Sequence, residues 1–541
     1  MAAGLNRERS LERFRDEKFD LAVIGGGVNG AAVARDAAMR GLKVALVERG
    51  DFAGATSSRS SKLIHGGFRY LPQGQLRLVY HALRERERLR RRTAPHLVKP
   101  IRFLFPVYRG RGFGRFTMAM GLFLYDFFAR TPSGERHESL GAARVREYEP
   151  TLSRGGLKGG ALYYDAWAED SRITFENVLD AGLHGAAIAN YVGVEGFAKS
   201  DGLLASASVR DLRGGTTCEL RARHFVNAAG PWVDEIRRMD DPLANRSIRT
   251  TKGVHLVFQR AMVPVRESLV LGDTNDRIVF VMPHDRYVLV GTTDTDYAGD
   301  PAAVATEPAD VTYLLSVLAA SLPGIKLTPD DVVASFAGLR ALVVAEGKGA
   351  PSSVPREEEI LRSASGLFSV AGGKLTTHRE IAEKVVIAVL REMGHSVKPS
   401  PTRDTPLPGA RKLDRSETGD ALAKLPREAR DILNARYGTR AQIVAATALG
   451  NADLSRPLSQ ACPAIGAEVV SAVRNEMVLS IADFLVRRTS LSWRAPLEAE
   501  AAAPVVARIL ASELGWDRAR EQAELAEFNR MYGRGRVAAA T

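Results

Sequence analysis

Two short apolar runs near the start of the chain enclose an alanine-rich segment. LAVIG at residues 21–25 and LKVALVE at residues 42–48 have the length and apolar content of buried strands. The segment between them, AAVARDAAMRG at residues 31–41, is rich in helix-forming alanine and ends at a glycine. The pattern predicts a strand, a helix and a second, parallel strand, as at the start of many α/β domains.

Alternating strand and helix patterns continue along the chain. The segments typical of a cofactor domain lie far apart in the sequence, at residues 19–70, 221–235 and 331–380. We therefore predict a Rossmann-like α/β domain that is assembled from discontinuous segments of residues 1–398.

The remaining segments predict three further parts. Strand-rich inserts, mainly residues 95–160 and 240–330, predict an antiparallel-sheet cap over the substrate. Residues 399–412 are proline-rich, which is typical of a linker. Helical patterns such as SAVRNEMVLSIADFLVRR, residues 471–488, predict a helical C-terminal domain over residues 413–541.

A glycine fingerprint lies between the first strand and the first helix. Gly25, Gly27 and Gly30 have the spacing G-x-G-x-x-G, and Glu48 ends the second strand about 20 residues further on. In such a motif the glycines admit a pyrophosphate at the helix N-terminus, and the acid accepts from ribose hydroxyls. A tight strand–helix turn without a ligand is the alternative interpretation.

The fingerprint alone does not separate FAD from NAD. The chain has no second G-x-G-x-x-G, which argues against a flavin enzyme that also binds a nicotinamide in a domain of its own. Residues 366–377, GLFSVAGGKLTT, predict a strand and a glycine pair just before a helix. Such a helix start directs N–H groups at the flavin pyrimidine carbonyl, where negative charge collects on reduction. A plain structural turn is again the alternative.

Residues 60–70, SSKLIHGGFRY, place many hydrogen-bond donors around a glycine pair. Gly66 and Gly67 weaken the interior of a helix or strand, so the stretch predicts an irregular bend. From the residues alone, two interpretations stay open: a phosphate-binding loop and an irregular structural loop.

Cysteine content limits the redox chemistry. The 541 residues include two cysteines, Cys218 and Cys462, and no C-x-x-C pair. This argues against a dithiol centre, a cysteine-ligated iron–sulfur cluster and a secreted disulfide scaffold. We expect no metal site.

The net charge of +12 is compatible with nucleic acid, an anionic membrane surface or an anionic substrate. No nucleic-acid-binding motif is present and aromatic residues make up only 7% of the chain. A basic nucleic-acid-binding protein with a vestigial nucleotide fold is therefore the weakest alternative, and we expect no nucleic-acid partner.

Two segments bear on membrane contact. Residues 115–130, RFTMAMGLFLYDFFAR, form an apolar run that is too short to span a bilayer but long enough to lie in its interface. A buried helix with charged ends is the alternative. Residues 84–92, RERERLRRR, carry six arginines and two glutamates, which favours anionic lipid.

Several phrases, in this order, resemble one family. They are ATSSRSSKLIHGGFRYL, FVNAAGPWVD, TKGVHLVF, RIVFVMPHDRYVLVGTTDTDY, FAGLRALV and SVAGGKLTTHREIA. Over about residues 19–395 the chain resembles the FAD-dependent glycerol-3-phosphate dehydrogenases, which belong to the amino-acid-oxidase-like flavoproteins. The resemblance implies FAD as cofactor and oxidation of sn-glycerol 3-phosphate to dihydroxyacetone phosphate, with quinone as electron acceptor. Close relatives pass electrons to oxygen, so a peroxide-forming oxidase is the alternative.

The resemblance implies that the bend at residues 60–70 lies beside the flavin, between the dinucleotide and the substrate. The FAD-binding residues that it implies, together with those of the fingerprint, are Gly25, Gly27, Asn29, Gly30, Glu48, Thr56, Ser57, Ser58, Ser61, Lys62, Leu63, His65, Gly66, Gly67, Ala229, Gly230, Trp232, Gly373, Lys374, Leu375 and Thr376.

A phosphate dianion needs charge-assisted donors, and arginine supplies them in bidentate geometry. By resemblance, the substrate-binding residues are Arg69, Tyr70, Arg340, Arg362, Lys374 and Thr376. The resemblance also places Arg340 and His255 in the catalytic site. His255 is the preferred base for the hydroxyl proton, with His65 as the alternative. Asp294 orients a neighbour or caps a turn.

Charge mixing in the first twenty residues argues against a secretory signal. We expect a cytoplasmic protein that is associated peripherally with the inner face of the cytoplasmic membrane, as the resemblance implies. The sequence does not fix the oligomeric state, and a homodimer is compatible with it.

Overall fold

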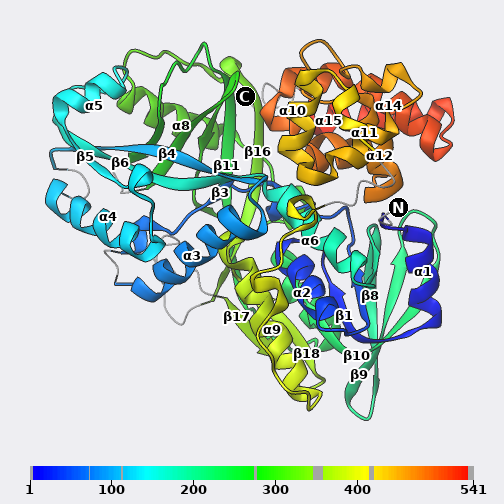
Figure 1. Cartoon of the computed structure of the whole chain (residues 1–541). Helices are drawn as coiled ribbons and strands as arrows, with labels where there is room; N and C mark the ends of the chain where they lie inside the picture. Colours follow the sequence, from blue (N-terminus) through cyan, green and yellow to red (C-terminus); the bar gives the residue numbers. More distant parts are fainter. Residues whose placement is uncertain are drawn as a thin grey trace.

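The computed structural model describes residues 4–71, 74–110, 114–272, 277–344, 358–412 and 419–533. It has three parts: an α/β domain, a second domain built on a large sheet, and a helical domain near the C-terminus (Figure 1). The predicted fold class is confirmed.

The α/β domain is built on sheet A, whose described strands number eight. Its central order is β17–β18–β10–β1–β2–β7, and β1 pairs in parallel with both β10 and β2. The hairpin β8–β9 joins the sheet through β10. The strands are β1 (Lys18–Ile24), β2 (Val44–Val47), β7 (Ala187–Ala189), β8 (Val192–Ser200), β9 (Leu203–Asp211), β10 (Thr217–Asn227), β17 (Glu359–Arg362) and β18 (Leu367–Ala371).

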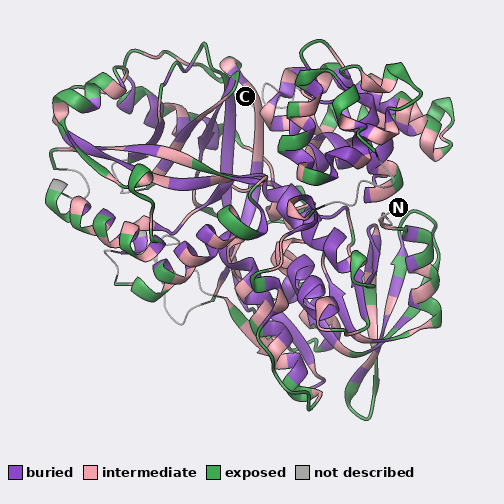
Figure 2. Ribbon diagram, in the orientation of Figure 1, coloured by how far each residue is buried: buried purple, intermediate pink, exposed green. Residues whose placement is uncertain are grey.

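Sheet A is covered on both faces, which explains why its parallel strands are apolar throughout. In β1, Leu21 and Val23 pack towards helices, whereas Ala22 and Ile24 pack towards the opposite face. On the first face lie α2 (Val28–Met39), α6 (Asp170–Leu183) and α9 (His378–Glu392). On the second lie α1 (Arg7–Asp16), α7 (Val233–Asp240) and the β8–β9 hairpin. The buried interior of this sandwich is visible in Figure 2.

The second domain contains sheet B, with ten described strands in the main order β15–β11–β14–β13–β12–β4–β6–β3. All its pairings are antiparallel except that of β12 with β4. The strands are β3 (Leu63–Ile64), β4 (Val98–Tyr108), β5 (Glu138–Gly141), β6 (Leu157–Ala168), β11 (Ile248–Gln259), β12 (Ser268–Gly272), β13 (Ile278–His284), β14 (Tyr287–Gly291), β15 (Thr295–Asp296) and β16 (Val332–Val343).

Sheet B extends beyond the two inserts that the sequence predicted. Strand β16 pairs with β11 over nearly its whole length, and β3 pairs with the end of β6. Both added strands come from segments that the motifs had suggested for the cofactor domain, so the two domains share their connecting strands. The flanking helices are α3 (Leu76–Arg88), α4 (Arg115–Ala129), α5 (Ala142–Tyr148) and α8 (Pro308–Ser321).

The helical part contains α10 (Arg427–Tyr437), α11 (Ala441–Thr447), α12 (Gly466–Glu476), α13 (Leu491–Arg494), α14 (Pro496–Leu514) and α15 (Arg518–Tyr532). The helical pattern at residues 471–488 is interrupted, because Met477 adopts a left-handed conformation after α12 ends. A π-helical turn, Asp483–Arg488, follows the break. Side chains replace the lost helical bonds: Arg488 donates to the Glu476 carbonyl and Asn190 to the Met477 carbonyl.

The proline-rich segment 399–412 lies packed on the α/β domain. Ser400 and Thr402 are buried beside Asp36 of α2, and the amide of Gly409 donates to Glu176 of α6 at 3.1 Å. The proline-rich composition is typical of a linker, but proline and polar residues also suit short turns. The segment forms two 3₁₀ turns.

A buried ion pair connects the α/β domain to the helical domain. Both terminal nitrogens of Arg172 on α6 donate to the carboxylate of Glu476 on α12 at 2.7 Å. The two side chains are 1% and 5% exposed. The guanidinium also lies 4.5 Å from the ring centre of Tyr437.

We predict that Arg172→Met lowers the free energy of urea-induced unfolding by about 3–5 kcal/mol, because it leaves the carboxylate of Glu476 buried without its bidentate partner. The matched control is Arg474→Met, whose pair with Glu513 involves an arginine side chain that is 61% exposed. That change should cost less than about 1 kcal/mol. Equal losses would show that the buried pair does not hold the domains together.

Candidate active site

A cavity of about 810 Å³ lies where the α/β domain meets sheet B. One end is lined by the glycine turn after β1 and by the end of β2. The other end is lined by residues of β11 and β16, together with the loop that precedes α9. The cavity therefore joins the predicted nucleotide site to the predicted substrate site.

The glycine turn has the geometry of a dinucleotide site. Gly25 has φ +107°, a value that favours glycine, and a Cβ on Gly30 would lie 1.9 Å from the carbonyl oxygen of Gly25. Gly30 therefore permits close packing of α2 and lies behind the cavity wall. A Cβ on Gly27 would meet only Ser57 Oγ, at 3.4 Å, so the protein leaves this side of the turn open to a ligand.

Glu48 lies at the end of β2 and lines the cavity. Its carboxylate accepts from the amides of Gly26 at 2.6 Å and Gly50 at 2.7 Å. Burial raises the pKa of Glu48, although these two amides act in the opposite direction. The acid is therefore held by backbone and presented to the space where ribose hydroxyls are expected.

The stretch after β2 divides its side chains between the cavity and the interior. Thr56, Ser57, Ser61 and Leu63 line the cavity. Ser58 and Lys62 are buried behind them: the Lys62 ammonium lies 2.8 Å from Asp170 and donates to the Ser58 carbonyl. The structure therefore separates these two predicted FAD-binding residues from the cavity wall.

The glycine pair in this stretch is required by packing. A Cβ on Gly66 would lie 2.4 Å from Leu83, and one on Gly67, which has φ +78°, would lie 2.5 Å from the ring of Tyr70. The amide of Gly66 donates to Tyr125 Oη at 2.8 Å. As a result, His65 and Gly67 line the cavity while Gly66 faces inwards.

The loop before α9 closes the same end of the cavity. Thr376 Oγ1 accepts from the amide of His65 at 3.2 Å, which holds this loop against the stretch after β2. The Lys374 ammonium lies 4.4 Å from the ring centre of Tyr70. Several other predicted FAD-binding residues also line the cavity: Asn29, Ala229, Gly230, Trp232, Gly373, Lys374, Leu375 and Thr376.

His255 lies on β11 and lines the cavity. Its ring stacks on Phe336 at 4.8 Å with an angle of 15° between planes, and Nε2 lies 2.9 Å from Ser61 Oγ. Nδ1 has no hydrogen-bond partner among the described residues. Burial lowers the pKa of His255 well below its usual value, and the charges of Arg340 and Lys62 act in the same direction. The imidazole is therefore neutral near pH 7.

Arg340 extends from β16 into the same region. Its guanidinium donates to the carbonyl of Thr293 and to Asp294 at 3.2 Å each, and to Thr292 Oγ1 at 3.0 Å. Of the two roles that the sequence allowed for Asp294, its contact with Arg340 fits the orientation of a neighbour.

Two predicted substrate-binding residues, Arg362 and Tyr70, do not line the cavity, and the side chain of a third, Arg69, is not described. Arg362 lies on the edge strand β17, where its 44% exposed side chain pairs with Glu392. This placement differs from the expectation from the motif, which did not show that the strand would lie at the edge of sheet A with its arginine paired to α9. Tyr70 is buried beneath Gly67. The side chain of Arg69 lies outside the described residues.

Several lining residues were not predicted. Sheet B contributes Phe105, Tyr163 and Phe280, which make part of the wall apolar. Apolar alternation marks such residues as inward-facing but does not distinguish a core from a cavity wall. Asp51 and Arg487 also line the cavity, and neither belongs to a local motif.

Two absences hold for the described part of the chain. It contains no group of three or more histidine, cysteine or acidic residues that could hold a metal ion. Among the described helices, none is both long and apolar enough to cross a bilayer.

Comparison with known families and structures gives a consistent result. The family described as "FAD dependent oxidoreductase" matches residues 20–385, and the "C-terminal domain of alpha-glycerophosphate oxidase" matches residues 400–521. The chain is 36% identical over 506 residues to an aerobic glycerol-3-phosphate dehydrogenase from Staphylococcus haemolyticus, covering 90% of this chain and 89% of that one. The protein of the same name from Bacillus subtilis is also 36% identical, with 90% of each chain covered.

A solved structure extends the similarity to the whole fold. The glycerol-3-phosphate dehydrogenase from Bacillus halodurans, complexed with FAD, has a TM-score of 0.78 and 29% identity, covering 98% of this chain and 97% of that one. The FAD-bound L-alpha-glycerophosphate oxidase from Mycoplasma pneumoniae shares the fold, with a TM-score of 0.56, 20% identity and coverage of 72% and 99%. The chain therefore belongs to the FAD-dependent oxidoreductases, within the family whose members are named aerobic glycerol-3-phosphate dehydrogenase.

Proposed function

We propose that this chain oxidises sn-glycerol 3-phosphate to dihydroxyacetone phosphate with FAD as the hydride acceptor. One observation carries the proposal: a neutral histidine and an oriented arginine, on paired strands, line the same cavity as the dinucleotide turn. The activity in the names of the relatives supports the same substrate.

His255 supplies the base in this proposal. Oxidation of the C2 alcohol releases a proton from the hydroxyl group and a hydride from carbon, and bound FAD supplies the acceptor for the hydride. A neutral imidazole has a lone pair for the proton, and burial keeps His255 in that form. Ser61 and Phe336 fix the ring through a hydrogen bond and a stacked contact.

Arg340 and Lys374 bind the phosphate in this proposal. Both line the cavity, from β16 and from the loop before α9. Asp294 orients the guanidinium of Arg340, whose side chain remains 21% exposed. Charge-assisted donors of this kind prefer a dianion to a neutral alcohol. Arg69 remains a proposed substrate contact on resemblance alone. Thr376 holds the loop before α9 against the stretch after β2 through the backbone of His65.

An exposed apolar face supports peripheral membrane contact. Phe116, Met120, Phe123 and Phe127 are 80%, 57%, 64% and 69% exposed, and their spacing places them on one side of α4. The opposite side of the helix packs into the core through residues such as Tyr125. Helix α4 lies at the outer side of the second domain, away from the helical domain (Figure 1). An apolar helix face flanked by arginine fits the interface of a bilayer.

The basic run at residues 84–92 contributes less to such contact than its composition suggested. Five of its six arginines are paired within the protein: Arg86 with Asp165, Arg88 with Glu85, Arg90 with Glu135, Arg91 with Glu87 and Arg92 with Asp404. We propose that the apolar face of α4 inserts among lipids and that the net charge of +12 favours an anionic leaflet. Quinone, which is soluble in the bilayer, is the proposed electron acceptor, and the inner face of the cytoplasmic membrane is the proposed location.

Arg340→Ala should lower kcat/KM for glycerol 3-phosphate far more than for unphosphorylated glycerol. One lost charge-assisted contact is worth about 1.5–3 kcal/mol, or roughly 10- to 100-fold. Arg362→Ala is the matched control, since its side chain pairs with Glu392 outside the cavity, and should change neither value. If Arg340→Ala lowers kcat/KM equally for glycerol 3-phosphate and glycerol, Arg340 does not bind the phosphate.

His255→Ala should slow anaerobic flavin reduction by about 10²- to 10⁴-fold without changing flavin content. In the unaltered protein the rate should fall on acidification, because protonation removes the base. Since the pKa of His255 is lowered by burial, this fall should lie below pH 6.5 and should vanish in the variant. His65→Ala should retain the acidic fall. The opposite pattern would make His65 the base.

Phe123→Ser combined with Phe127→Ser should weaken sedimentation with vesicles that contain anionic lipid, because the two exposed rings supply the inserted apolar surface. Charge reversal at Arg91 and Arg92 is the comparison and should have a smaller effect, since both are paired within the chain. Vesicle binding that depends only on the arginines would contradict insertion of α4. An oligomeric state in both variants that matches the unaltered protein would show that this face does not join two copies of the chain.

A further inference from the structure

The helical domain contributes one residue to the cavity wall. Among the residues that the structure describes, Arg487 is the only lining residue beyond position 400. It belongs to the π-helical turn that follows the break after α12. Its side chain lines the cavity and is 10% exposed, so it is not fully enclosed by protein atoms.

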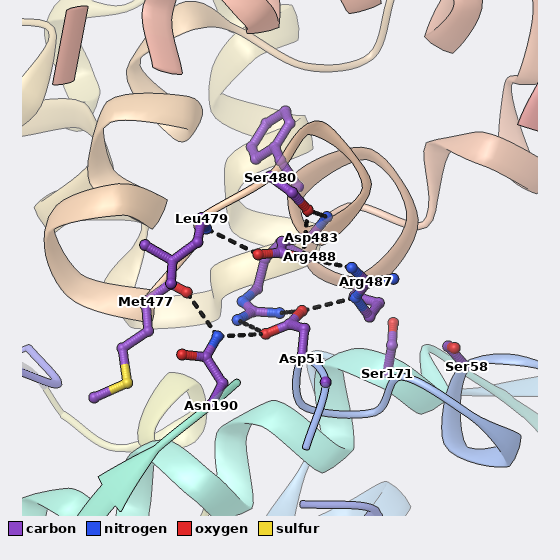
Figure 3. A network of polar contacts seen from close by, with 12 residues as sticks. Asp51, Ser58, Ser171, Asn190, Met477, Leu479, Ser480, Asp483, Arg487 and Arg488 are labelled. Atoms are coloured by element: carbon purple, nitrogen blue, oxygen red, sulfur yellow. Dashed lines mark hydrogen bonds and ion pairs between the residues drawn. The ribbon is translucent and has the colours of Figure 1, made fainter. Parts of the chain in front are cut away.

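Asp51 joins this turn to the nucleotide end of the cavity. The residue lies three positions after Glu48, and each oxygen of its carboxylate accepts two hydrogen bonds (Figure 3). One oxygen accepts from Arg487 Nε at 2.7 Å and from Arg488 Nη1 at 2.8 Å. The other accepts from Arg488 Nη2 and Asn190 Nδ2, each at 3.0 Å. The two guanidinium groups hold the pKa of Asp51 below its usual value despite burial.

Arg487 is itself held between two carboxylates. Nε donates to Asp51 and Nη2 donates to Asp483. Asp483 also accepts from Tyr191 Oη at 2.6 Å. Nη1 has no hydrogen-bond partner within the described chain, although Arg487 lines the cavity. The side chain is therefore fixed in direction, with one charged donor available to a ligand.

The surrounding residues identify the part of FAD that this donor meets. Tyr191 also lines the cavity, and its amide donates to the carbonyl of Gly50, whose own amide holds Glu48. Arg487 therefore lies at the end of the cavity where the fingerprint places the adenosine diphosphate half of the dinucleotide. Phosphate and ribose oxygens are the acceptors that a guanidinium prefers there.

We propose that Arg487 is an FAD-binding residue contributed by the helical domain, and that it donates to the adenosine diphosphate half of the cofactor. FAD binding and docking of the helical domain then stabilise each other, because the same side chain joins Asp51, Asp483 and the ligand. Coupling of this kind is reciprocal: the ligand strengthens docking by the same factor by which docking strengthens binding.

The first test measures binding to the full-length protein after removal of FAD, without substrate. Arg487→Gln should weaken binding of both FAD and ADP by about 10- to 100-fold in calorimetric titrations, as expected for loss of one charge-assisted donor. Arg487→Lys, which keeps the charge, should lose less. Arg474→Gln is the control, since its partner Glu513 lies away from the cavity wall, and should bind both ligands normally. FAD and ADP affinities within twofold of the unaltered protein in Arg487→Gln would overturn the proposal.

The second test measures hydrogen exchange of residues 480–490 by mass spectrometry, with and without FAD. FAD should slow exchange in the unaltered protein, and this protection should be reduced in Arg487→Gln. Asp51→Asn should speed exchange in the absence of FAD and also weaken FAD binding, because it loosens the turn that holds Arg487. If FAD leaves exchange of this segment unchanged in the unaltered protein, docking and binding are not coupled and the proposal is wrong, whether or not any variant folds.

Discussion

The ion pair between Lys62 and Asp170 holds together the segment on which both halves of the cavity depend. The ammonium lies 2.8 Å from the carboxylate, and the two side chains are 1% and 0% exposed. Asp170 also accepts from the amide and the hydroxyl of Ser60, so that the chain is wrapped around one buried carboxylate. From this anchor, Ser61 reaches His255 and the chain continues into β3 of sheet B. A buried charge that loses its partner costs several kcal/mol, which makes this arrangement hard to distort.

The two sheets divide the chemistry between them. Sheet A and the start of α2 provide the glycine turn and the carboxylate of Glu48, a combination suited to a dinucleotide. Sheet B provides the side chains that we propose to act on the substrate, because antiparallel strands β11 and β16 bring His255 and Arg340 to one wall. The positive charge of Arg340 favours a phosphate and at the same time helps to keep His255 unprotonated. In the proposed function, Arg340 therefore contributes both to phosphate binding and to the unprotonated state required of His255.

The elements that the sequence predicted correctly depend on near neighbours in the chain. The strand–helix–strand unit around Gly25, the strand and helix around Gly373, and the helical character of the last domain follow from local periodicity and glycine spacing. The remaining features depend on partners distant in sequence. Composition predicted a cationic surface at residues 84–92, yet Arg86 pairs with Asp165 in the interior. Arg487 was missed because its partner, Asp51, is 436 positions away. The position of Arg362 was not predicted, because a local motif does not show that its strand lies at the sheet edge or that the side chain pairs with Glu392, 30 positions away.

Hydride transfer from sn-glycerol 3-phosphate to FAD is the step on which the proposed function of this cavity depends. Anaerobic titration of the purified, flavin-loaded protein tests it most directly, with the visible absorbance of the flavin as the measured quantity. We predict stoichiometric bleaching by glycerol 3-phosphate and little bleaching by glycerol at the same concentration. Subsequent addition of a quinone should restore the colour faster than admission of air. A flavin that stays oxidised in the presence of excess glycerol 3-phosphate would show that the cavity does not carry out this reaction.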